Sequence, residues 1–275
     1  MNIGIVGLGV IGGSFARAIK AKTAHTVWGF DINETSVKMA LDCGAIDEKL
    51  TDENIKSCDM VMVCIYPYKT VEYIKQNADK FKKGSMVVDV CGVKRYIKEQ
   101  VADVLSQNDV KFIAAHPMAG RGVAGFESSL ATLYENASYI IADKDADKNS
   151  VQILSKLASD IGFTNIVVTT EDEHDEVIAY TSQMAHILSN AYVKSPSYKK
   201  HKGFSAGSFA DLSRVAKLDA NMWSDLFLLN RDNLLTEFDC YLKHLQEYKV
   251  ALETENRDEL YKILKDGNDI KVGLK

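Results

Sequence analysis

The first residues with a recognisable chemical pattern are the glycines of Gly7-Leu8-Gly9-Val10-Ile11-Gly12, close to the N-terminus. Their spacing is that of a turn that holds the phosphates of a dinucleotide. The first glycine would allow a tight turn, the second a close approach of backbone to a pyrophosphate, and the third close packing of a helix on a strand. Free N–H groups at the start of that helix would attract the phosphates. A glycine turn without a ligand is the alternative interpretation.

Asp31 indicates which dinucleotide would bind. It ends a second apolar run, about 20 residues after the glycines. A carboxylate at this place can accept hydrogen bonds from the hydroxyls of the adenine ribose, and it would repel a 2′-phosphate. No arginine follows Asp31 directly, so the sequence predicts NAD, and not NADP, as the cofactor. The complete series of strand, turn, helix, strand and aspartate favours dinucleotide binding over an empty turn.

His116 could transfer a proton in the reaction of such a cofactor. Ligands of doubly wound sheets bind outside the carboxyl ends of the strands. Three segments that follow predicted strands are therefore expected on one rim, with Ile65, Pro67 and Cys91 beside the cofactor: Ile65-Tyr66-Pro67, Val90-Cys91-Gly92 and His116-Pro117. A dehydrogenase needs a group that accepts the hydroxyl proton, and histidine has a pKa near neutrality. From position alone, a histidine that only caps the strand end is an equally good interpretation.

The elements that must position these residues follow from the hydrophobic pattern. Short apolar runs predict strands, and apolar residues at helical spacing predict helices between them. The predicted strands are Ile3–Val6, Thr26–Phe30, Met60–Ile65, Met86–Val90, Phe112–Ala115, Tyr139–Ala142 and Asn165–Thr169, and helices are predicted over Val10–Lys20, Thr35–Leu41 and Ser150–Ile161. Strands that alternate with helices imply right-handed crossovers and an α/β fold with a doubly wound, mainly parallel sheet, the Rossmann fold.

Beyond residue 170 the pattern becomes helical. Helical spacing extends over residues 175–193, 222–245 and 256–264, and no clear strand follows. We therefore predict a dinucleotide-binding Rossmann domain over residues 1–170 and an all-helical domain for substrate binding and dimerisation over residues 171–275. A helical half of this size often completes its core with a second copy, so a homodimer is expected.

The composition is that of an ordinary globular enzyme, with 46% hydrophobic and 26% charged residues among 275. The net charge of −5 argues against a nucleic-acid partner, which would require a basic face. No segment has the length of a transmembrane helix, so we expect no membrane contact and a cytoplasmic protein. The five cysteines have no paired spacing, which indicates neither disulfides nor a metal site. They are interpreted as buried small apolar residues in a reducing cytosol.

The residues around His116 extend this interpretation to a family. His116-Pro117-Met118-Ala119-Gly120 resembles the His-Pro-Met/Ile-Ala-Gly motif of prephenate dehydrogenases. Further matches to that family follow in the same order over nearly the whole chain: His174-Asp175, Ser182–His186, Gly207–Ala216, Asp219–Trp223 and Asn230. Each motif is weak alone, and the combination is specific.

The resemblance implies an NAD-dependent oxidative decarboxylation of prephenate to 4-hydroxyphenylpyruvate, a step of tyrosine biosynthesis. His116 would accept or polarise the hydroxyl proton, and Arg214 would bind a substrate carboxylate through its bidentate guanidinium. Asp211, three residues earlier on a presumed helix, could hold Arg214 in position. His186 would face the substrate from the second domain, although a buried core histidine is the alternative. Gln183 could help to distinguish prephenate from arogenate, and tyrosine could act as a competing, product-like inhibitor.

Two positions depart from the family pattern. Many members carry a serine where this chain has Gly92, so either a backbone N–H or the neighbouring Cys91 replaces that contact, or His116 acts without it. Arg121 stands near a place where relatives often have an acidic residue, so an ion pair there with the substrate-binding arginine is in doubt.

Three other functions compete with this one. A 3-hydroxyacid dehydrogenase would share the two-domain plan, but it needs a catalytic lysine, and none lies between His174 and Tyr192. A non-catalytic NAD-binding sensor is disfavoured by the presence of both His116 and Arg214. Arogenate dehydrogenase differs only in the side chain of its substrate, and the sequence does not separate it from prephenate dehydrogenase.

Overall fold

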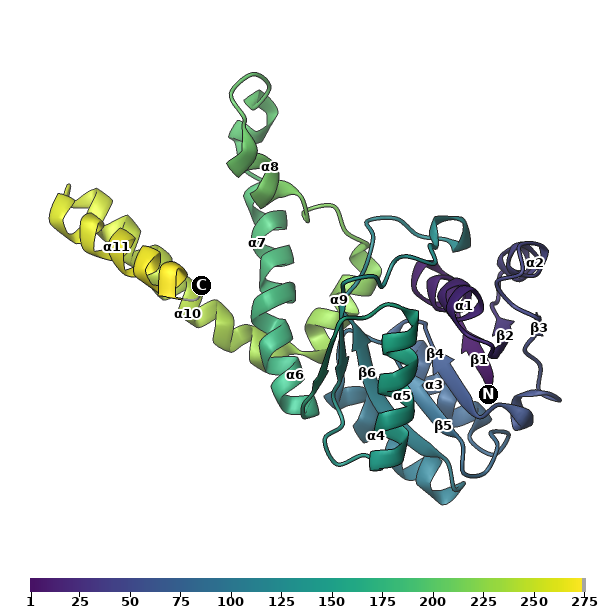
Figure 1. Ribbon diagram of the computed structural model, residues 1–275. Helices are drawn as coiled ribbons and strands as arrows, with labels where there is room; N and C mark the ends of the chain where they lie inside the picture. The colour runs from purple at the N-terminus through teal and green to yellow at the C-terminus, as the bar shows by residue number, and fades with distance from the viewer. Residues whose placement is uncertain (274–275) are drawn as a thin grey trace.

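A computed structural model describes residues 1–273, and in this range the chain forms an eight-stranded sheet (Figure 1). The strand order is β3-β2-β1-β4-β5-β6-β7-β8. All neighbouring strands are parallel except β6 and β7. The strands are β1 (Asn2–Val6), β2 (Thr26–Phe30), β3 (Glu48–Lys49), β4 (Met60–Val63), β5 (Met86–Asp89), β6 (Lys111–Pro117), β7 (Ser138–Ile141) and β8 (Asn165–Val168). The predicted doubly wound, mainly parallel sheet is confirmed.

Helices cover both faces of the sheet. Their bounds are α1 (Val10–Lys22), α2 (Glu34–Asp42), α3 (Pro67–Asn77), α4 (Arg95–Gln107) and α5 (Lys148–Ile161). Buried residues of α1, α2 and α5 form one apolar core with β1, β4 and β5. Residues of α3 and α4 form a second core on the opposite face. Because the order of strands reverses between β1 and β4, the loops after these strands diverge and leave a crevice of the kind in which such folds bind ligands.

The chain beyond β8 is helical, as predicted. Its helices are α6 (Glu171–Ile178), α7 (Ala185–Tyr192), α8 (Gly207–Ser213), α9 (Ala220–Leu229), α10 (Arg231–Glu253) and α11 (Arg257–Gly273). A π-helical turn, Ala179–Met184, joins α6 to α7. Thr170 caps α6, because its hydroxyl accepts a hydrogen bond from the Glu173 N–H. The boundary that we propose at residue 170 lies at this cap.

The predicted helix over residues 222–245 is wrong in one respect, because it is two helices that meet at Asn230. Asn230 is fully buried, and its amide nitrogen donates to the Asp175 carbonyl and the Gln183 Oε1, each at 2.8 Å. These side-chain bonds hold Asn230 outside helical geometry, with φ −119° and ψ 28°. The helix predicted over residues 256–264 continues to Gly273.

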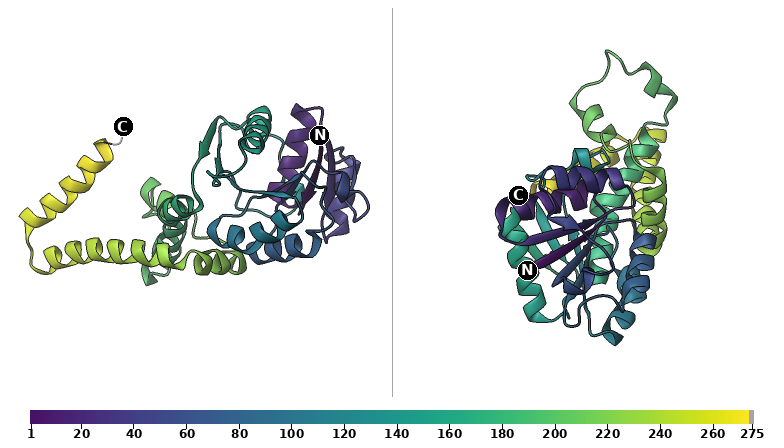
Figure 2. Two further views of the ribbon diagram at one scale, coloured as in Figure 1. Left: turned by 90° about the horizontal axis from the view of Figure 1, so that it is seen from below. Right: turned by 90° about the vertical axis from the view of Figure 1, so that its right-hand side faces the viewer.

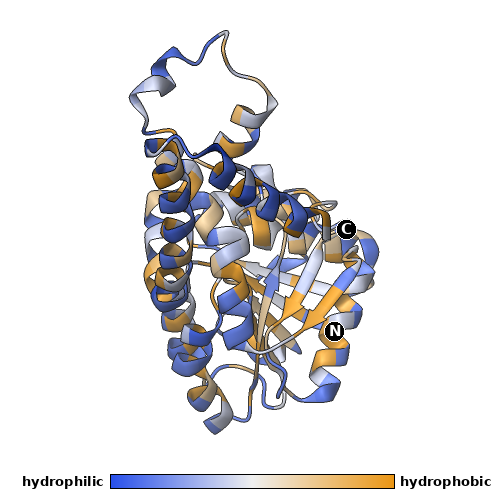
Figure 3. Cartoon of the chain, turned by 90° about the vertical axis from the view of Figure 1, so that its left-hand side faces the viewer, coloured by the Kyte–Doolittle hydropathy of each residue, from blue (hydrophilic) through white to orange (hydrophobic). Residues whose placement is uncertain are grey.

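Helices α10 and α11 extend away from the sheet as an arm (Figure 2). Few of their residues are buried. Figure 3 shows apolar residues along these helices as well as in the sheet. The exposed ones include Leu235, Leu242, Leu245, Leu252, Leu264 and Ile270. An arm of this composition leaves a large apolar surface uncovered in a single chain.

Two further observations concern the whole of residues 1–273. No helix in this range combines the length and the apolar character that crossing a bilayer would require. The cysteines do not all follow the prediction: Cys58 and Cys91 are buried and Cys64 is partly buried, whereas Cys43 and Cys240 are exposed.

Candidate active site

The glycine turn between β1 and α1 has little room for side chains at two of its positions. Gly7 has φ +89°, a conformation that favours glycine, and an added Cβ would lie 2.5 Å from the Ile65 side chain. An added Cβ on Gly12 would lie 1.9 Å from the Gly7 carbonyl oxygen, because α1 packs directly on the end of β1. Gly9 differs, since no atom lies within 4 Å of its added Cβ. The turn is therefore tight on the protein side and open at Gly9.

Asp31 at the end of β2 is bound to this turn. Its Oδ2 accepts a hydrogen bond from the Leu8 N–H at 2.7 Å, and its Oδ1 accepts one from the Asn33 N–H at 2.8 Å. Each oxygen keeps a further lone pair for a ligand hydroxyl. No side chain caps the N-terminus of α1, and its first turn carries no acidic residue. The backbone N–H groups of Val10 and Ile11 are thus left for an anion.

The loops after β4 and β5 lie side by side, as expected for this rim. The Cys91 thiol donates to the Ile65 carbonyl at 3.3 Å and lies 3.4 Å from the Thr70 hydroxyl. Pro67 occupies the first turn of α3, where its missing N–H costs no hydrogen bond. Burial raises the pKa of the Cys91 thiol to about 12, so this cysteine is a neutral structural link between the two loops and is unsuited to replace a serine toward the substrate.

Gly92, rather than Cys91, lies beside the candidate base. His116 is half-buried near the end of β6. An added Cβ on Gly92 would lie 3.9 Å from the His116 Cε1 and 3.5 Å from the Leu226 side chain. These are ordinary contact distances, so there is space for a small side chain at this position.

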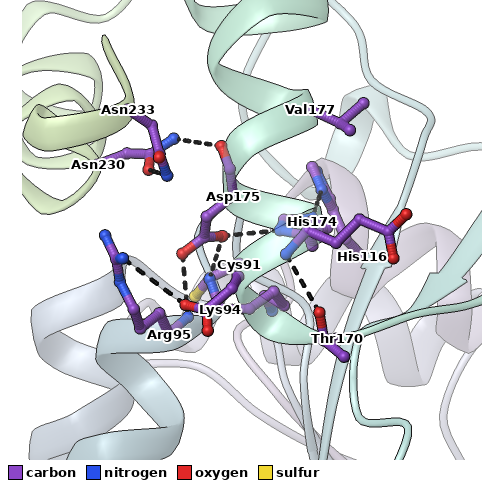
Figure 4. Close-up of polar contacts among 12 residues, drawn as sticks. Cys91, Lys94, Arg95, His116, Thr170, His174, Asp175, Val177, Asn230 and Asn233 are labelled. Atoms are coloured by element: carbon purple, nitrogen blue, oxygen red, sulfur yellow. Dashed lines mark hydrogen bonds and ion pairs between the residues drawn. The ribbon is translucent and has the colours of Figure 1, made fainter. Parts of the chain in front are cut away.

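His116 contacts His174 of α6 in the helical domain, and His174 in turn contacts Asp175 of the same helix (Figure 4). The His116 Nδ1 lies 2.9 Å from the Nε2 of His174, and the His174 Nδ1 lies 2.7 Å from the Asp175 Oδ1. The two imidazole rings meet edge to face. Both residues of α6 are buried. In the sequence, His174-Asp175 is only a match to the family pattern, and the contact with His116 appears only in the fold.

Burial and nearby positive charge keep His116 neutral. Burial lowers the pKa of His116 well below its ordinary value of 6.5, and His174 and Lys94 lower it further. Burial also lowers the pKa of His174, although Asp175 opposes this shift. At neutral pH both rings are therefore uncharged, which is the state in which a histidine can accept a proton.

A buried ion pair lies next to the strand end that carries His116. The Lys94 ammonium contacts the Asp89 carboxylate, and both side chains are fully buried. The same ammonium donates to the Ala115 carbonyl at 2.7 Å, one residue before His116. This pair joins the ends of β5 and β6. Sequence reasoning missed it, and the only available signal was a lysine five residues after an aspartate at a strand end.

Gln183 lies in the π-helical turn and is buried. Its Oε1 accepts from Asn230 at 2.8 Å, and its Nε2 donates to the Leu226 carbonyl at 3.4 Å. The amide thus joins α9 and α10 to the helix that carries His174. A contact between Gln183 and substrate stays a prediction.

His186 and Arg214 lie near one another at a second place in the helical domain. The His186 Nδ1 is 3.0 Å from the Val215 carbonyl oxygen, and its ring packs against Trp223 at a tilt of 41°, with 3.9 Å between centroids. Burial lowers the pKa of His186, and the charge of Arg214 contributes to this. His186 and Trp223 line a hollow of about 290 Å³ between α7 and α9, and His116 is not among its lining residues.

The proposed support of Arg214 by Asp211 is absent from the structure. Helix α8 ends at Ser213, so Arg214 lies at its C-terminal cap. Both side chains are exposed, and within residues 1–273 no ion pair joins them. Arg214 keeps helical dihedral angles, with φ −55° and ψ −42°, so its spacing from Asp211 is still that of one helix face, and support of Arg214 by Asp211 stays a prediction.

Known proteins resemble the chain over both halves. The family model for the nucleotide-binding domain of prephenate dehydrogenase matches residues 15–167, and the model for the dimerization domain of prephenate dehydrogenase matches residues 170–266. Prephenate dehydrogenase of Bacillus subtilis is 28% identical over 280 residues, which cover 98% of this chain and 75% of that protein. Cyclohexadienyl dehydrogenase of Zymomonas mobilis is 27% identical over 288 residues, covering 100% and 96%.

Solved structures show the same relationship. The crystal structure of A. aeolicus prephenate dehydrogenase in complex with hydroxyphenyl propionate and NAD+ has a TM-score of 0.88 and 28% identity, covering 100% of this chain and 98% of that one. Arogenate dehydrogenase of Synechocystis, at 22% identity, shares the fold with a TM-score of 0.84 and full coverage of both chains. The two family matches together span most of the sequence, and the chain belongs to the prephenate dehydrogenase family of NAD-dependent oxidoreductases.

Proposed function

We propose that this chain converts prephenate to 4-hydroxyphenylpyruvate, with NAD as the oxidant. The observation that carries the proposal is the position of His116. Its ring is neutral and half-buried near the carboxyl end of β6, beside the open space at Gly92, and one of its two nitrogens is held by His174. The other nitrogen is available to a substrate hydroxyl.

The residues of the glycine turn fit a dinucleotide. The space at Gly9 and the uncapped start of α1 would take the pyrophosphate, with Leu8, Val10 and Ile11 providing backbone around it. Asp31 would accept hydrogen bonds from the adenine ribose and would repel a 2′-phosphate, which favours NAD. Bound NAD would supply the acceptor for the hydride, a proton with two electrons, that leaves the ring carbon of the substrate. The structure of the A. aeolicus relative contains NAD+, which supports this choice.

His116 would move one proton twice. It accepts the proton of the ring hydroxyl as that carbon is oxidised, so that the electron pair of the O–H bond stays on oxygen and forms a carbonyl. Carbon dioxide then leaves, and the electrons of the broken C–C bond restore the aromatic ring. The proton returns from His116 to the oxygen, which completes the phenol. Arg214 would hold a carboxylate of the substrate, and His186 lies close to it.

The exposed apolar residues of α10 and α11 support a homodimer. Residues such as Leu242, Leu252 and Leu264 would lie in water in a single chain. A second copy of the same surface would cover them by two-fold symmetry. Sedimentation equilibrium tests this directly, and a Leu242→Glu variant should shift the chain toward monomer.

The test of the function is NADH formation from NAD with prephenate or with arogenate, repeated with NADP. Turnover with prephenate and NAD is expected. Turnover with arogenate alone would keep the roles of His116 and Asp31 and change the substrate. No turnover with either, in a folded protein that binds NAD, would refute the proposal. Tyrosine is expected to raise the apparent KM for prephenate, and an unchanged KM would exclude it as a competitor.

A further inference from the structure

We propose that Asp175 and His174 act as positioning residues that fix His116 in one tautomer, with hydrogen on Nδ1 and a lone pair on Nε2 directed to the substrate. The inference rests on the proposed function for its consequence, since His116 is the base of that reaction. The tautomer itself follows from the hydrogen bonds around Asp175 and can be measured without any turnover.

Asp175 can only accept hydrogen bonds in this structure. Its Oδ1 accepts from the Lys94 N–H at 2.8 Å, and its Oδ2 accepts from the Arg95 N–H at 3.0 Å. Its side chain is fully buried. A buried carboxyl group with a donor on each oxygen is stabilised as the carboxylate, which has no hydrogen to give. The ring nitrogen that meets the Asp175 Oδ1 at 2.7 Å must therefore carry hydrogen, and this nitrogen is the His174 Nδ1.

The position of the hydrogen on the His174 ring determines its position on the His116 ring. A neutral imidazole carries hydrogen on one nitrogen only, so the Nε2 of His174 has a lone pair. The His116 Nδ1, 2.9 Å away, must donate to this lone pair, because two acceptors at that distance would repel. The hydrogen of His116 is thus on Nδ1, and its Nε2 is the acceptor. If His174 were absent, no partner would hold this tautomer, and a base with hydrogen on Nε2 could not take a proton there.

The same series of residues stabilises His116 after it has taken the proton. The imidazolium then donates from Nδ1 to His174, and the negative charge of Asp175 lies behind that ring. The other charged groups near the site are the Lys94 ammonium, which opposes the imidazolium, and Asp89, which neutralises Lys94. Asp175 therefore provides, behind the neutral His174 ring, a negative charge that the Lys94–Asp89 pair, which is neutral overall, does not provide.

Selective ¹⁵N labelling of histidine and two-bond N–H correlation spectra read the tautomers in the full chain without substrate. The measurement is made well above the ordinary histidine pKa of about 6.5. We expect the hydrogen on Nδ1 in both His116 and His174. Signals are assigned by comparison with His116→Asn and His174→Gln variants. Hydrogen on the Nε2 of His116 would overturn the inference, whether or not the protein oxidises prephenate.

Two substitutions of His174 then test the effect on turnover. The carbonyl oxygen of His174→Gln can take the place of Nε2 and accept from the His116 Nδ1, whereas His174→Leu offers no acceptor. We expect His174→Leu to lower kcat by roughly 100-fold with KM values within about threefold, and His174→Gln to recover about tenfold of that loss. His25→Gln is the matched control, because His25 precedes β2, which three strands separate from β6, and its kcat should not change.

The two experiments separate the possible failures. Equal losses in the two folded His174 variants, or losses confined to KM, would show that His174 has a merely structural or binding role. If no substrate is turned over by the unaltered chain, the proposed function fails, while the spectra still decide the tautomer. Circular dichroism and the unfolding midpoint of each variant show whether it has folded.

Discussion

Replacing Lys94 by methionine should destabilise the protein strongly, because it leaves the Asp89 carboxylate buried without its cation. Both side chains of this pair are fully buried. Removing one partner of such a pair costs about 3–5 kcal/mol. Asp89 keeps one hydrogen bond, from the Cys91 N–H at 3.1 Å, so the lower end of the range, about 3 kcal/mol, is expected. That is roughly a 100-fold change in the folding equilibrium.

The loss of stability in Lys94→Met should depend on the charge of Asp89, and a second substitution tests this. Burial already raises the pKa of Asp89 in the parent protein and Lys94 opposes this shift, so Lys94→Met should raise the folded-state pKa further above its unfolded value. The lost stability should then return as the pH falls through that raised value, because the folded chain takes up a proton first. Asp89→Asn in the same chain removes the charge, and we expect it to recover about 2 kcal/mol of the loss at pH 7.

The assay is urea unfolding at a fixed protein concentration, since an oligomer gains apparent stability with concentration. Lys38→Met is the matched control. Lys38 forms an exposed ion pair with Asp42 on α2, and its loss should cost less than about 0.5 kcal/mol. A Lys94→Met variant within about 1 kcal/mol of the parent, or a double variant no more stable than Lys94→Met, would refute the view of Asp89 as a charge held by Lys94.

Four other predictions concern the site. His116→Asn should lower kcat by about 100-fold or more with little change in KM, and near-normal turnover would mean that another group is the base. Arg214→Gln should raise the KM for prephenate by about ten- to a hundredfold, and an unchanged KM would remove Arg214 from the substrate site. Gly92→Ser should exceed Gly92→Ala in kcat by roughly two- to tenfold if the new hydroxyl reaches the substrate, and equal rates would show that it does not. Burial lowers the folded-state pKa of His116 and His174, so the free energy of unfolding should be highest above about pH 6.5 and should decrease as the pH falls below it. Urea unfolding midpoints measured over this pH range should show the decrease, and the decrease should be smaller in His116→Asn.

The sheet and the glycine turn could be predicted from the sequence because their signals are local. An apolar run of four to six residues bounded by a turn predicts a buried strand. The observed strands β1, β2, β4 and β5 lie where the sequence has such runs. The short strand β3 was missed, since its two residues, Glu48 and Lys49, carry no apolar run. Asp31 could be identified because its distance along the chain from the glycines is set by one strand–helix–strand unit.

The support of His116 could not be predicted, because it depends on contacts between residues far apart in the sequence. His174 lies 58 positions after His116, and neither residue alone shows that their rings touch. The break at Asn230 escaped prediction for the same reason, since the partners of its amide, Gln183 and the Asp175 carbonyl, belong to another helix. The pairing of Asp211 with Arg214, suggested by helical spacing, stays a prediction, since both residues have helical backbone but their side chains are exposed and form no ion pair within residues 1–273.

Through the hydrogen bonds of Asp175, the state of His116 in the sheet domain depends on how the helical domain packs against it. The carboxylate accepts from two N–H groups at the start of α4, in the sheet domain, while its own helix carries His174. An exposed ion pair fixes the same junction, because Arg95 donates to both oxygens of Asp232 on α10, at 2.7 and 2.8 Å. A shift of α6 by the length of a hydrogen bond would separate His174 from His116, and the ring would lose the partner that selects its tautomer. The active state of His116, the base that we propose, thus depends on the domain interface as well as on the strand end that carries it.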